Sequence, residues 1–187
     1  MITLEDWALI RPFKRDPNSV EPGEATTDRC EGPTLYVMAG QILAVVELTA
    51  DNVEDVLAVA PSSEQLRHVN PVAWYVARSA YQQVWHPVGL ATADGEVVGF
   101  AEWAYDDSDG TYNLGGIVID HRHQGRGLGP AALDALVAHL RARPVPGDIA
   151  LTVHADNERA RGLYERYGFA ATSDVIEGEL VMVLGRS

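Results

Sequence analysis

The sequence predicts an α/β domain in which a meander of strands precedes helices that alternate with further strands. Three apolar segments separated by turn residues indicate the meander: VGLATA, EVVGFAEWAY and TYNLGGIVID. Two amphipathic segments indicate helices, one from about Gly127 to Arg143 and one opened by Asn157. Between them IALTVH is typical of a buried strand, and the last two apolar segments, FAATSD and ELVMVL, complete the sheet. At 187 residues, the chain is long enough for one domain with a sizeable core.

Turn and cap residues support these boundaries. Asp94-Gly95 after the first strand is a hairpin signal, and the acidic DDSDG forms the next turn. DDSDG has the composition of a calcium loop but lacks the later glutamate, so we expect an ordinary turn there. Gly168 stands where the second helix should end in a left-handed residue. The first helix carries one apolar stripe, made of Leu133, Leu136, Val137 and Leu140.

The segments before the meander carry weaker signals. LYVMA and QILAVVEL, around Ala39-Gly40, predict a hairpin. Thr49 predicts the N-cap of a short helix ending near Val59, and the following polar stretch, 61–69, is expected to be a loop. Asn70 followed by Pro71 predicts the start of a helix through AWYVARSAYQQVW. We therefore expect an N-terminal extension over residues 1–40 and the domain proper over residues 41–187.

Composition excludes several classes of protein. Lys and Arg total 14 and Asp and Glu total 27, so the net charge of −13 disfavours nucleic acid and favours a cationic small molecule. An acidic surface that only confers solubility is the competing interpretation. No apolar run is long enough to span a membrane, and the N-terminus does not resemble a signal peptide. The single cysteine, Cys30, excludes an internal disulfide, and no Cys/His spacing indicates a metal site, so a cytoplasmic, metal-free protein is expected.

Three glycines, Gly125, Gly127 and Gly129, lie where the first long helix must begin. A helix start presents unpaired N–H groups and the positive end of the helix dipole, which bind anions such as phosphates. Side chains at these positions would hold a phosphate away from the N–H groups. The turn therefore predicts a diphosphate cradle, with Arg122 and Arg126 adding charge at its rim. The spacing fits neither a dinucleotide-binding fold nor a P-loop.

Two segments together resemble the GCN5-related N-acetyltransferase (GNAT) family. QGRGLG, residues 124–129, matches the pyrophosphate-binding signature Q-x-x-G-x-G of that family and follows a strand. NERARGLYERYGF, residues 157–169, matches its second cofactor segment, N-x-x-A-x-x-L-Y-x-x-x-G-F. The resemblance covers roughly residues 41–185. The pattern VGF…Y…DG followed by HQGRG is most similar to the polyamine and diamine acetyltransferase branch.

The resemblance implies a GNAT fold, in which a mixed sheet is splayed between two strands, here TYNLGGIVID and IALTVH. Gly115-Gly116 in the first of these strands also predicts a bulge. The resemblance further implies acetyl-CoA as the acetyl donor, with no metal. By resemblance the cofactor-binding residues are Ile117, Val118 and Ile119 for the pantetheine arm, Gln124, Gly125, Arg126, Gly127, Leu128 and Gly129 for the pyrophosphate, and Asn157 and Tyr164.

Amine acetylation requires loss of an amine proton, stabilisation of an oxyanion and protonation of the leaving sulfur. Tyr164 resembles the general acid of the family, although its place on the apolar helix face also fits a core residue. Glu102, in the middle strand, is the best carboxylate candidate for the base. The alternatives are a solvent-facing Glu102 and a water chain in place of a direct base. Asn113 stands roughly where some family members carry a catalytic glutamate, so this chain departs from them there.

Three functions fit the sequence. The preferred one is an acyltransferase that moves an acetyl group to a primary amine of a small cationic molecule, either a polyamine or an amine antibiotic. The alternatives are acetylation of a protein N-terminus or lysine, and a non-catalytic acyl-CoA-binding module in which Tyr164 only packs. Residues 1–40 could cover the acceptor site, extend the sheet or mediate a homodimer.

Overall fold

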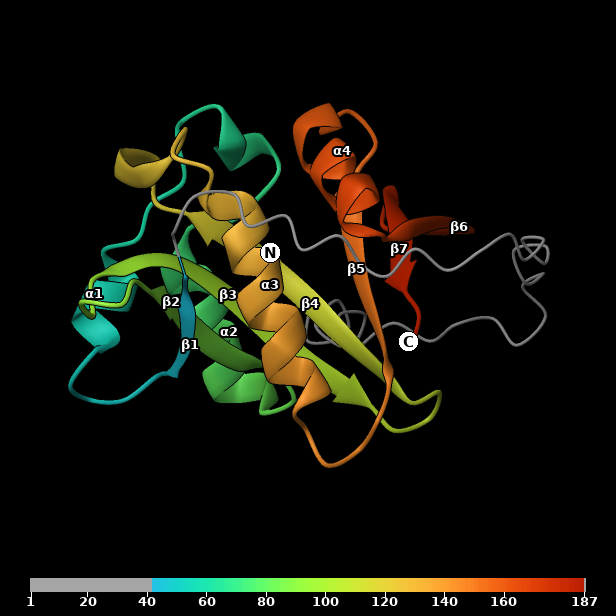
Figure 1. Ribbon diagram of the computed structural model, residues 1–187, viewed down its shortest axis with the longest axis horizontal. Helices are drawn as coiled ribbons and strands as arrows, with labels where there is room; N and C mark the ends of the chain where they lie inside the picture. Colours follow the sequence, from blue (N-terminus) through green and yellow to red (C-terminus); the bar gives the residue numbers. More distant parts are fainter. Residues whose placement is uncertain (1–41, 187) are drawn as a thin grey trace, which may run out of the picture.

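A computed structural model describes residues 42–186, which contain one seven-stranded sheet with helices on both faces (Figure 1). The strands are β1 (Ala44–Glu47), β2 (His86–Ala91), β3 (Val97–Asp106), β4 (Thr111–Ile119), β5 (Asp148–His154), β6 (Ala170–Ile176) and β7 (Glu179–Leu184). The helices are α1 (Val53–Leu57), α2 (Val72–Gln82), α3 (Leu128–Arg141) and α4 (Glu158–Tyr167), with short 3-10 turns η2 (Gln65–Arg67) and η3 (His121–His123). Among the described residues, no helix has both the length and the apolar character that a membrane span requires.

The strand order is β1-β2-β3-β4-β5-β7-β6, which confirms the predicted meander and mixed sheet. Strands β1 to β4 pair antiparallel in sequence order. Strand β5 then pairs parallel with β4, and the crossover between them contains α3. Strand β7 lies between β5 and β6, so the last two strands form a hairpin whose second strand pairs with β5 and whose first strand, β6, is the edge of the sheet.

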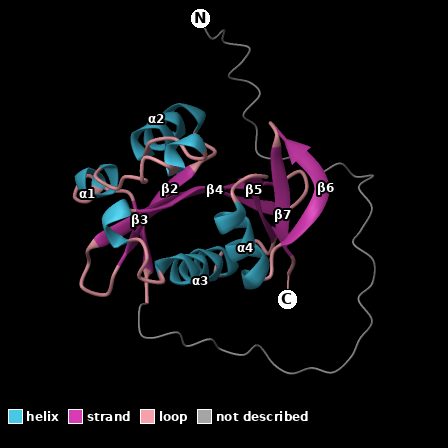
Figure 2. Cartoon of the chain, turned by 90° about the horizontal axis from the view of Figure 1, so that it is seen from above, coloured by secondary structure: helices cyan, strands magenta, loops and turns pink. Residues whose placement is uncertain are grey.

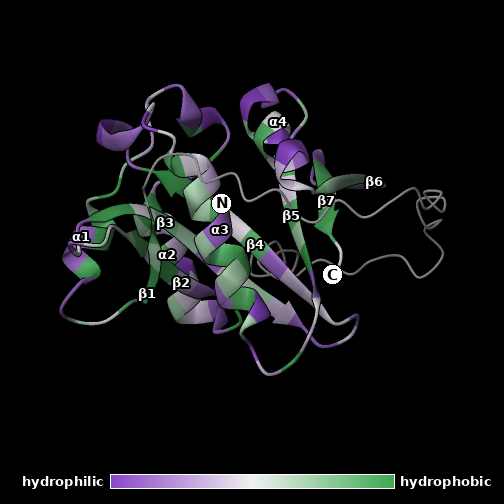
Figure 3. Ribbon diagram, in the orientation of Figure 1, coloured by the Kyte–Doolittle hydropathy of each residue, from purple (hydrophilic) through white to green (hydrophobic). Residues whose placement is uncertain are grey.

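Figure 2 shows α1 and α2 on one face of the sheet and α3 and α4 on the other. The predicted stripe of α3 is confirmed: Leu133, Leu136 and Leu140 are fully buried or nearly so, and Val137 is partly buried. Burial of each such side chain stabilises the fold by about 1.5–3 kcal/mol. Helix α4 buries no residue completely and is mostly hydrophilic (Figure 3), so its apolar side chains are left to line a cavity.

The sheet opens between β4 and β5. Their parallel pairing runs from Thr111 opposite Asp148 to Leu114 opposite Leu151 and then stops. Figure 1 shows the two strands diverging beyond this point. The splay expected from the family resemblance is therefore present between the two predicted strands.

The predicted bulge is also present, at Gly115-Gly116. Phe100 lies opposite Val118 but Glu102 lies opposite Gly115, so β4 has one more residue than β3 over this interval. Gly116 has φ 58°, and a Cβ there would lie 3.2 Å from the Tyr75 ring. The bulge ends regular pairing where the splay begins and brings Glu102 close to the backbone of Gly115.

Several predicted boundaries are wrong in detail. Thr49 does not cap α1, because the Asn52 side chain accepts a hydrogen bond from the Thr49 N–H and the helix starts at Val53. Asn70 does not cap α2 either, since Pro71 occupies the N-cap position and the Asn70 N–H donates to the Tyr75 hydroxyl. The expected loop 61–69 contains η2. The first strand of the hairpin predicted around Ala39-Gly40 lies outside the described residues, whereas β1 pairs with β2.

The glycines at the start of α3 have two different physical roles. Gly125 and Gly127 have φ of 77° and 78°, in the left-handed region that only glycine adopts at little cost. Gly129 has no such constraint, but a Cβ there would lie 3.1 Å from Leu163 Cδ2, so this glycine lets α4 approach α3.

Replacing Gly127 by alanine is expected to lower the free energy of unfolding by about 1–2 kcal/mol, because a left-handed conformation is costly for any residue with a Cβ. Urea denaturation measures this change. Gly185→Ala is the matched control, since Gly185 has no positive φ and a Cβ there meets no atom within 4 Å. Equal midpoints for the two variants would contradict the assignment of strain to position 127.

Candidate functional site

A cavity of about 670 Å³ lies in the opening between β4 and β5. One part of its wall comes from the start of α3, the splayed half of β5 and the inner face of α4. The other part comes from η2, α2 and the middle of β3. Both predicted catalytic residues, Glu102 and Tyr164, line this single cavity.

The glycine turn forms one end of the cavity. Gly125, Gly127, Leu128 and Gly129 all line it. Gly127 is the N-cap of α3, so the N–H groups of the first helical turn that follow it have no carbonyl partner within the helix. Among residues 42–186, nothing lies within 4 Å of the position that a Cβ would take at Gly125 or Gly127, so the space beside this turn is open. The arrangement suits a phosphate group.

The other residues predicted around this turn lie in different surroundings. Gln124 lines the cavity, but its amide group donates to Gln65 Oε1 at 2.6 Å and to the Ile119 carbonyl at 2.8 Å, so it joins η2 to the end of β4. Ile117 and Ile119 line the cavity, whereas the Val118 side chain is buried in the core cluster beneath α1 and α2. Arg126 is exposed and donates to the Arg122 carbonyl.

Arg122 is held by Asp120, a fully buried carboxylate at the end of β4. Asp120 also accepts hydrogen bonds from the backbone N–H groups of Ala60 and Arg122. Burial alone would raise the pKa of Asp120, but the hydrogen bonds from Arg122 and Ala60 hold it well below its usual range. Asp120 therefore stays charged and holds in place the backbone that leads into the glycine turn. Its ion pair with Arg122 reduces the positive charge that Arg122 offers at the rim of this turn.

Asn157 and Tyr164 line the cavity from α4. Asn157 caps α4 as predicted, since its side-chain oxygen accepts the Ala160 N–H at 3.2 Å. Only its amide nitrogen thus remains for a ligand. The Tyr164 ring packs against Phe169, with ring centroids 5.9 Å apart. Burial raises the pKa of Tyr164 to about 12, and the charge of Glu179 adds to the effect. Its hydroxyl therefore keeps its proton at neutral pH and acts there as a permanent hydrogen-bond donor.

Glu102 is fully buried, which excludes the solvent-facing alternative. Its Oε1 accepts a hydrogen bond from Arg78 Nη2, while its Oε2 has no partner among the described residues. Burial raises the pKa of Glu102 to about 7, against the lowering effect of Arg78. A carboxylate that titrates near neutral pH is matched to proton transfer at neutral pH.

Aromatic side chains surround the Arg78–Glu102 pair. The Arg78 guanidinium carbon lies 4.7 Å from the centroid of the Trp74 ring and 4.6 Å from that of Trp85. Sequence reasoning missed all three of these residues. Arg78 was detectable as an arginine on the buried face of α2, three residues after Tyr75, whereas Trp85 was placed in the predicted helix, which in the structure already ends at Gln82.

Unpaired polar atoms gather at this end of the cavity. Glu102 Oε2, Asn113 Nδ2 and Trp85 Nε1 are all buried without a hydrogen-bond partner in the described part of the chain. Such atoms are rare in folded proteins because each one costs free energy, and they commonly indicate a ligand site. All three residues line the cavity, which therefore has one acceptor and two donors in its wall that a ligand could satisfy.

Charged side chains of both signs line the cavity. On the α4 side Arg159 and Arg166 contribute positive charge. Glu177 and Glu179, from the β6–β7 hairpin, contribute negative charge together with Glu102. The wall thus offers positive groups on α4 to an anion and carboxylates on the β6–β7 hairpin to a cation, whereas the charge of Glu102 is paired with Arg78.

The comparisons with known proteins agree with this geometry. The model of the acetyltransferase (GNAT) family matches residues 50–169. A spermine/spermidine N(1)-acetyltransferase of Bacillus subtilis is 33% identical over 143 residues, which cover 73% of this chain and 93% of that protein. A mycothiol acetyltransferase of Propionibacterium freudenreichii is 39% identical over 106 residues, which cover 52% of this chain and 33% of that protein.

Solved structures share the fold. A spermidine N-acetyltransferase from Vibrio cholerae, in complex with CoA and spermine, matches with a TM-score of 0.57 and 17% identity, over 75% of this chain and 92% of that one. An aminoglycoside acetyltransferase in complex with coenzyme A matches with a TM-score of 0.64 and 20% identity, over 77% of this chain and 95% of that one. The chain belongs to the GNAT family of acetyltransferases and is an acyltransferase that takes its acetyl group from acetyl-CoA.

Proposed function

We propose that this protein acetylates a primary amine of a small polycationic molecule, with a polyamine as the preferred acceptor. The observation that carries the proposal is the buried Oε2 of Glu102, which has no hydrogen-bond partner in the described part of the chain and belongs to the same cavity as the glycine turn. A carboxylate oxygen with no protein partner suits an ammonium donor. Members of the family use acetyl-CoA as the acetyl donor, and one cavity would hold both this donor and the amine near Glu102.

The residues that line the cavity fit acetyl-CoA. The N–H groups of residues 125–129 would bind the pyrophosphate, because glycine at 125 and 127 leaves them uncovered. Ile117 and Ile119, at the splayed edge of β4, would present backbone groups to the pantetheine arm. The Asn157 amide nitrogen would donate to the same arm. Gln124 would act indirectly, by fixing η2 to β4.

Glu102 and Tyr164 would divide the proton chemistry. Deprotonating an alkylamine at pH 7 costs about 4–5 kcal/mol without assistance, since its pKa is near ~10.4. With a pKa of about 7, Glu102 is partly ionised at neutral pH and can accept that proton directly or through water. The amine nitrogen then attacks the thioester carbon, and the carbon–sulfur bond breaks. The Tyr164 hydroxyl would donate a hydrogen bond to the departing sulfur, which stabilises its negative charge.

Acidic and aromatic side chains support a polyamine as the acceptor. Glu177 and Glu179 line the same cavity from the β6–β7 hairpin and would bind the ammonium groups that are not acetylated. Trp74 and Trp85 already contact one cation, Arg78, and aromatic faces attract ammonium groups in the same way. The Bacillus subtilis relative is named for spermine and spermidine, and one structural neighbour contains spermine.

A panel of amines tests the proposal. Purified protein with acetyl-CoA is offered spermidine, spermine, putrescine, an aminoglycoside and a lysine peptide, with acetylated products identified by mass spectrometry. We expect the highest kcat/KM for a polyamine. Turnover of the peptide alone would favour protein acetylation, and acetyl-CoA binding without any turnover would favour a binding module; either result refutes the proposal. A cytoplasmic setting, a homodimer and the absence of nucleic-acid partners stay predictions.

Tyr164→Phe is expected to lower kcat about 10- to 100-fold, since it removes one hydrogen-bond donor to the leaving sulfur. The ring and its contact with Phe169 remain, so the KM for acetyl-CoA should change less than about threefold if Tyr164 acts mainly in the transition state. Steady-state kinetics with the best amine measures both constants. Tyr167→Phe, on the same helix, is the matched control. An unchanged kcat in Tyr164→Phe would assign the residue to packing alone.

A further inference from the structure

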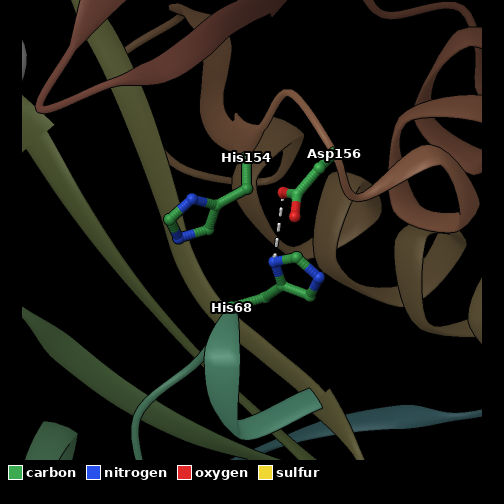
Figure 4. Close-up of side chains that lie close together, drawn as sticks. All are labelled: His68, His154 and Asp156. Carbon is green, nitrogen blue, oxygen red and sulfur yellow. Dashed lines mark ion pairs between the residues drawn. The ribbon is translucent and has the colours of Figure 1, made fainter. Parts of the chain in front are cut away.

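Two histidines and an aspartate converge at the edge of the cavity, outside the residues assigned to acetyl transfer. His68 follows η2, His154 ends β5, and Asp156 lies in the turn before α4 (Figure 4). Each offers one potential ligand atom, and these three atoms lie within 4.8 Å of one another. The spacing of these residues in the sequence gives no sign of the cluster. His68 lies on one side of the opening between β4 and β5, and His154 and Asp156 lie on the other.

His68 has a ring nitrogen that lacks a hydrogen-bond partner. The His68 side chain is 8% exposed, and its Nδ1 makes no hydrogen bond to a described residue. The closest charged group to this atom is Asp156 Oδ1, at 3.6 Å. An unpartnered polar atom in a buried side chain calls for an explanation, and a metal ion shared with the nearby carboxylate supplies one.

His154 is oriented as a metal-binding histidine commonly is. Its Nε2 lies 3.0 Å from Glu179 Oε1, which leaves Nδ1 as the ring nitrogen that is available to a metal ion. Such carboxylate–histidine pairs fix the tautomer of a ligating ring and increase its basicity. Glu179 would therefore support the site without binding the metal.

We propose that His68, His154 and Asp156 form a zinc-class metal site that closes the cavity when occupied. Two imidazole nitrogens and one carboxylate oxygen are ligands that Zn²⁺ accepts, with a fourth position left for water. The Asp156 side chain is 68% exposed, which gives an ion access from solvent. Small side-chain rotations would bring the three ligand atoms to the bonding distance of about 2.0–2.2 Å from one ion.

An ion here would tie the segment after η2 to the turn between β5 and α4. His68 and His154 both line the cavity, and they lie on opposite sides of the splay. A bridge between them would fix the cavity entrance in a narrow form and obstruct the substrates. The site would thus make acetyl transfer sensitive to Zn²⁺.

Cobalt absorption tests the binding step without any measurement of activity. Metal-free protein is titrated with Co²⁺, whose visible absorption reports a site of low coordination number, and Zn²⁺ is then added in competition. We expect one equivalent of Co²⁺ to give a visible band that Zn²⁺ displaces. A titration without such a band, or with a band that saturates only at several equivalents, would overturn the site.

Variants assign the ligands. Asp156→Asn changes an exposed side chain, so the fold should be retained, and it should weaken Co²⁺ binding at least ~10-fold; His68→Ala and His154→Ala should abolish the band. Glu179→Gln should weaken binding about 10- to 100-fold through its partner histidine. His139→Ala is the matched control, because His139 lies on α3 and pairs with Glu47 of β1, away from the cluster. An unchanged band in Asp156→Asn and His68→Ala, or a band lost in His139→Ala, would refute the assignment.

Zn²⁺ should also inhibit the wild-type enzyme, while Asp156→Asn should need at least ~10-fold more Zn²⁺ for the same inhibition. Acetylated amine is measured by mass spectrometry, since thiol dyes and free CoA bind zinc themselves. Zinc binding without inhibition would overturn the closing of the cavity. The absorption titration separates these results from a failure of the proposed reaction, because it needs neither acetyl-CoA nor an amine.

Discussion

Replacing Glu102 by glutamine is expected to lower kcat for amine acetylation by about 10²- to 10⁴-fold, the usual contribution of a positioned general base. The side chain keeps its size, and the glutamine oxygen can still accept from Arg78. The change therefore removes the proton acceptor and leaves the packing in place. Steady-state kinetics with saturating acetyl-CoA measures the effect. A kcat within threefold of wild type would show that water removes the proton unaided.

The pH profile identifies Glu102 more specifically than the rate does. Burial raises its pKa to about 7, so kcat of the wild type should rise with pH through that value as the carboxyl group loses its proton. In Glu102→Gln this rise should disappear, and activity should increase steadily with pH as more of the amine becomes neutral. Asp106→Asn is the matched control, because Asp106 lies on the same strand but binds the turn at Ser108. A rise near pH 7 that persists in Glu102→Gln would assign it to another group.

Local patterns predicted the second half of the fold well. The meander, the two long helices and the splay are carried by signals within a few residues of one another: Asp94-Gly95, the α3 stripe and the glycine pair in β4. The turn proposed to bind the cofactor could be singled out for the same reason, since residues 124–129 are consecutive in the sequence. The separate roles of the three glycines could not be predicted, because the closeness of Gly129 to Leu163 depends on how α3 and α4 pack together.

The acceptor end depends on contacts between distant segments. Arg78 and Glu102 come from different elements, and only the fold brings them into one buried pair. Sequence reasoning singled out Glu102 but could not decide between a buried and an exposed position, because both faces of β3 are covered by helices and the strand shows no alternation. His68 and His154 meet across the splay and had no local signal at all.

Arg78→Met should change both stability and the pH profile, since it removes the partner of a buried charge. Breaking a buried ion pair by removing one member typically costs about 3–5 kcal/mol, because the remaining charge is left uncompensated. Methionine keeps much of the side-chain volume against Trp74 and Trp85. Urea denaturation measures the loss, and Arg78→Met combined with Glu102→Gln should recover part of it because no buried charge remains.

The sign of the pH effect follows from the direction of the pKa shift. Arg78 lowers the pKa of Glu102, so its removal should raise that pKa above 7 and move the rise in kcat to higher pH. Because the folded-state pKa exceeds the ordinary value of 4.5, protonated Glu102 contributes stability below that value, and this contribution is lost as pH rises through the folded-state pKa. The variant should therefore lose little stability relative to wild type at pH 5 and most of it above pH ~8. An equal loss at both pH values, with the kcat profile unmoved, would mean that Arg78 serves only to pack the tryptophans and does not set the charge state of Glu102.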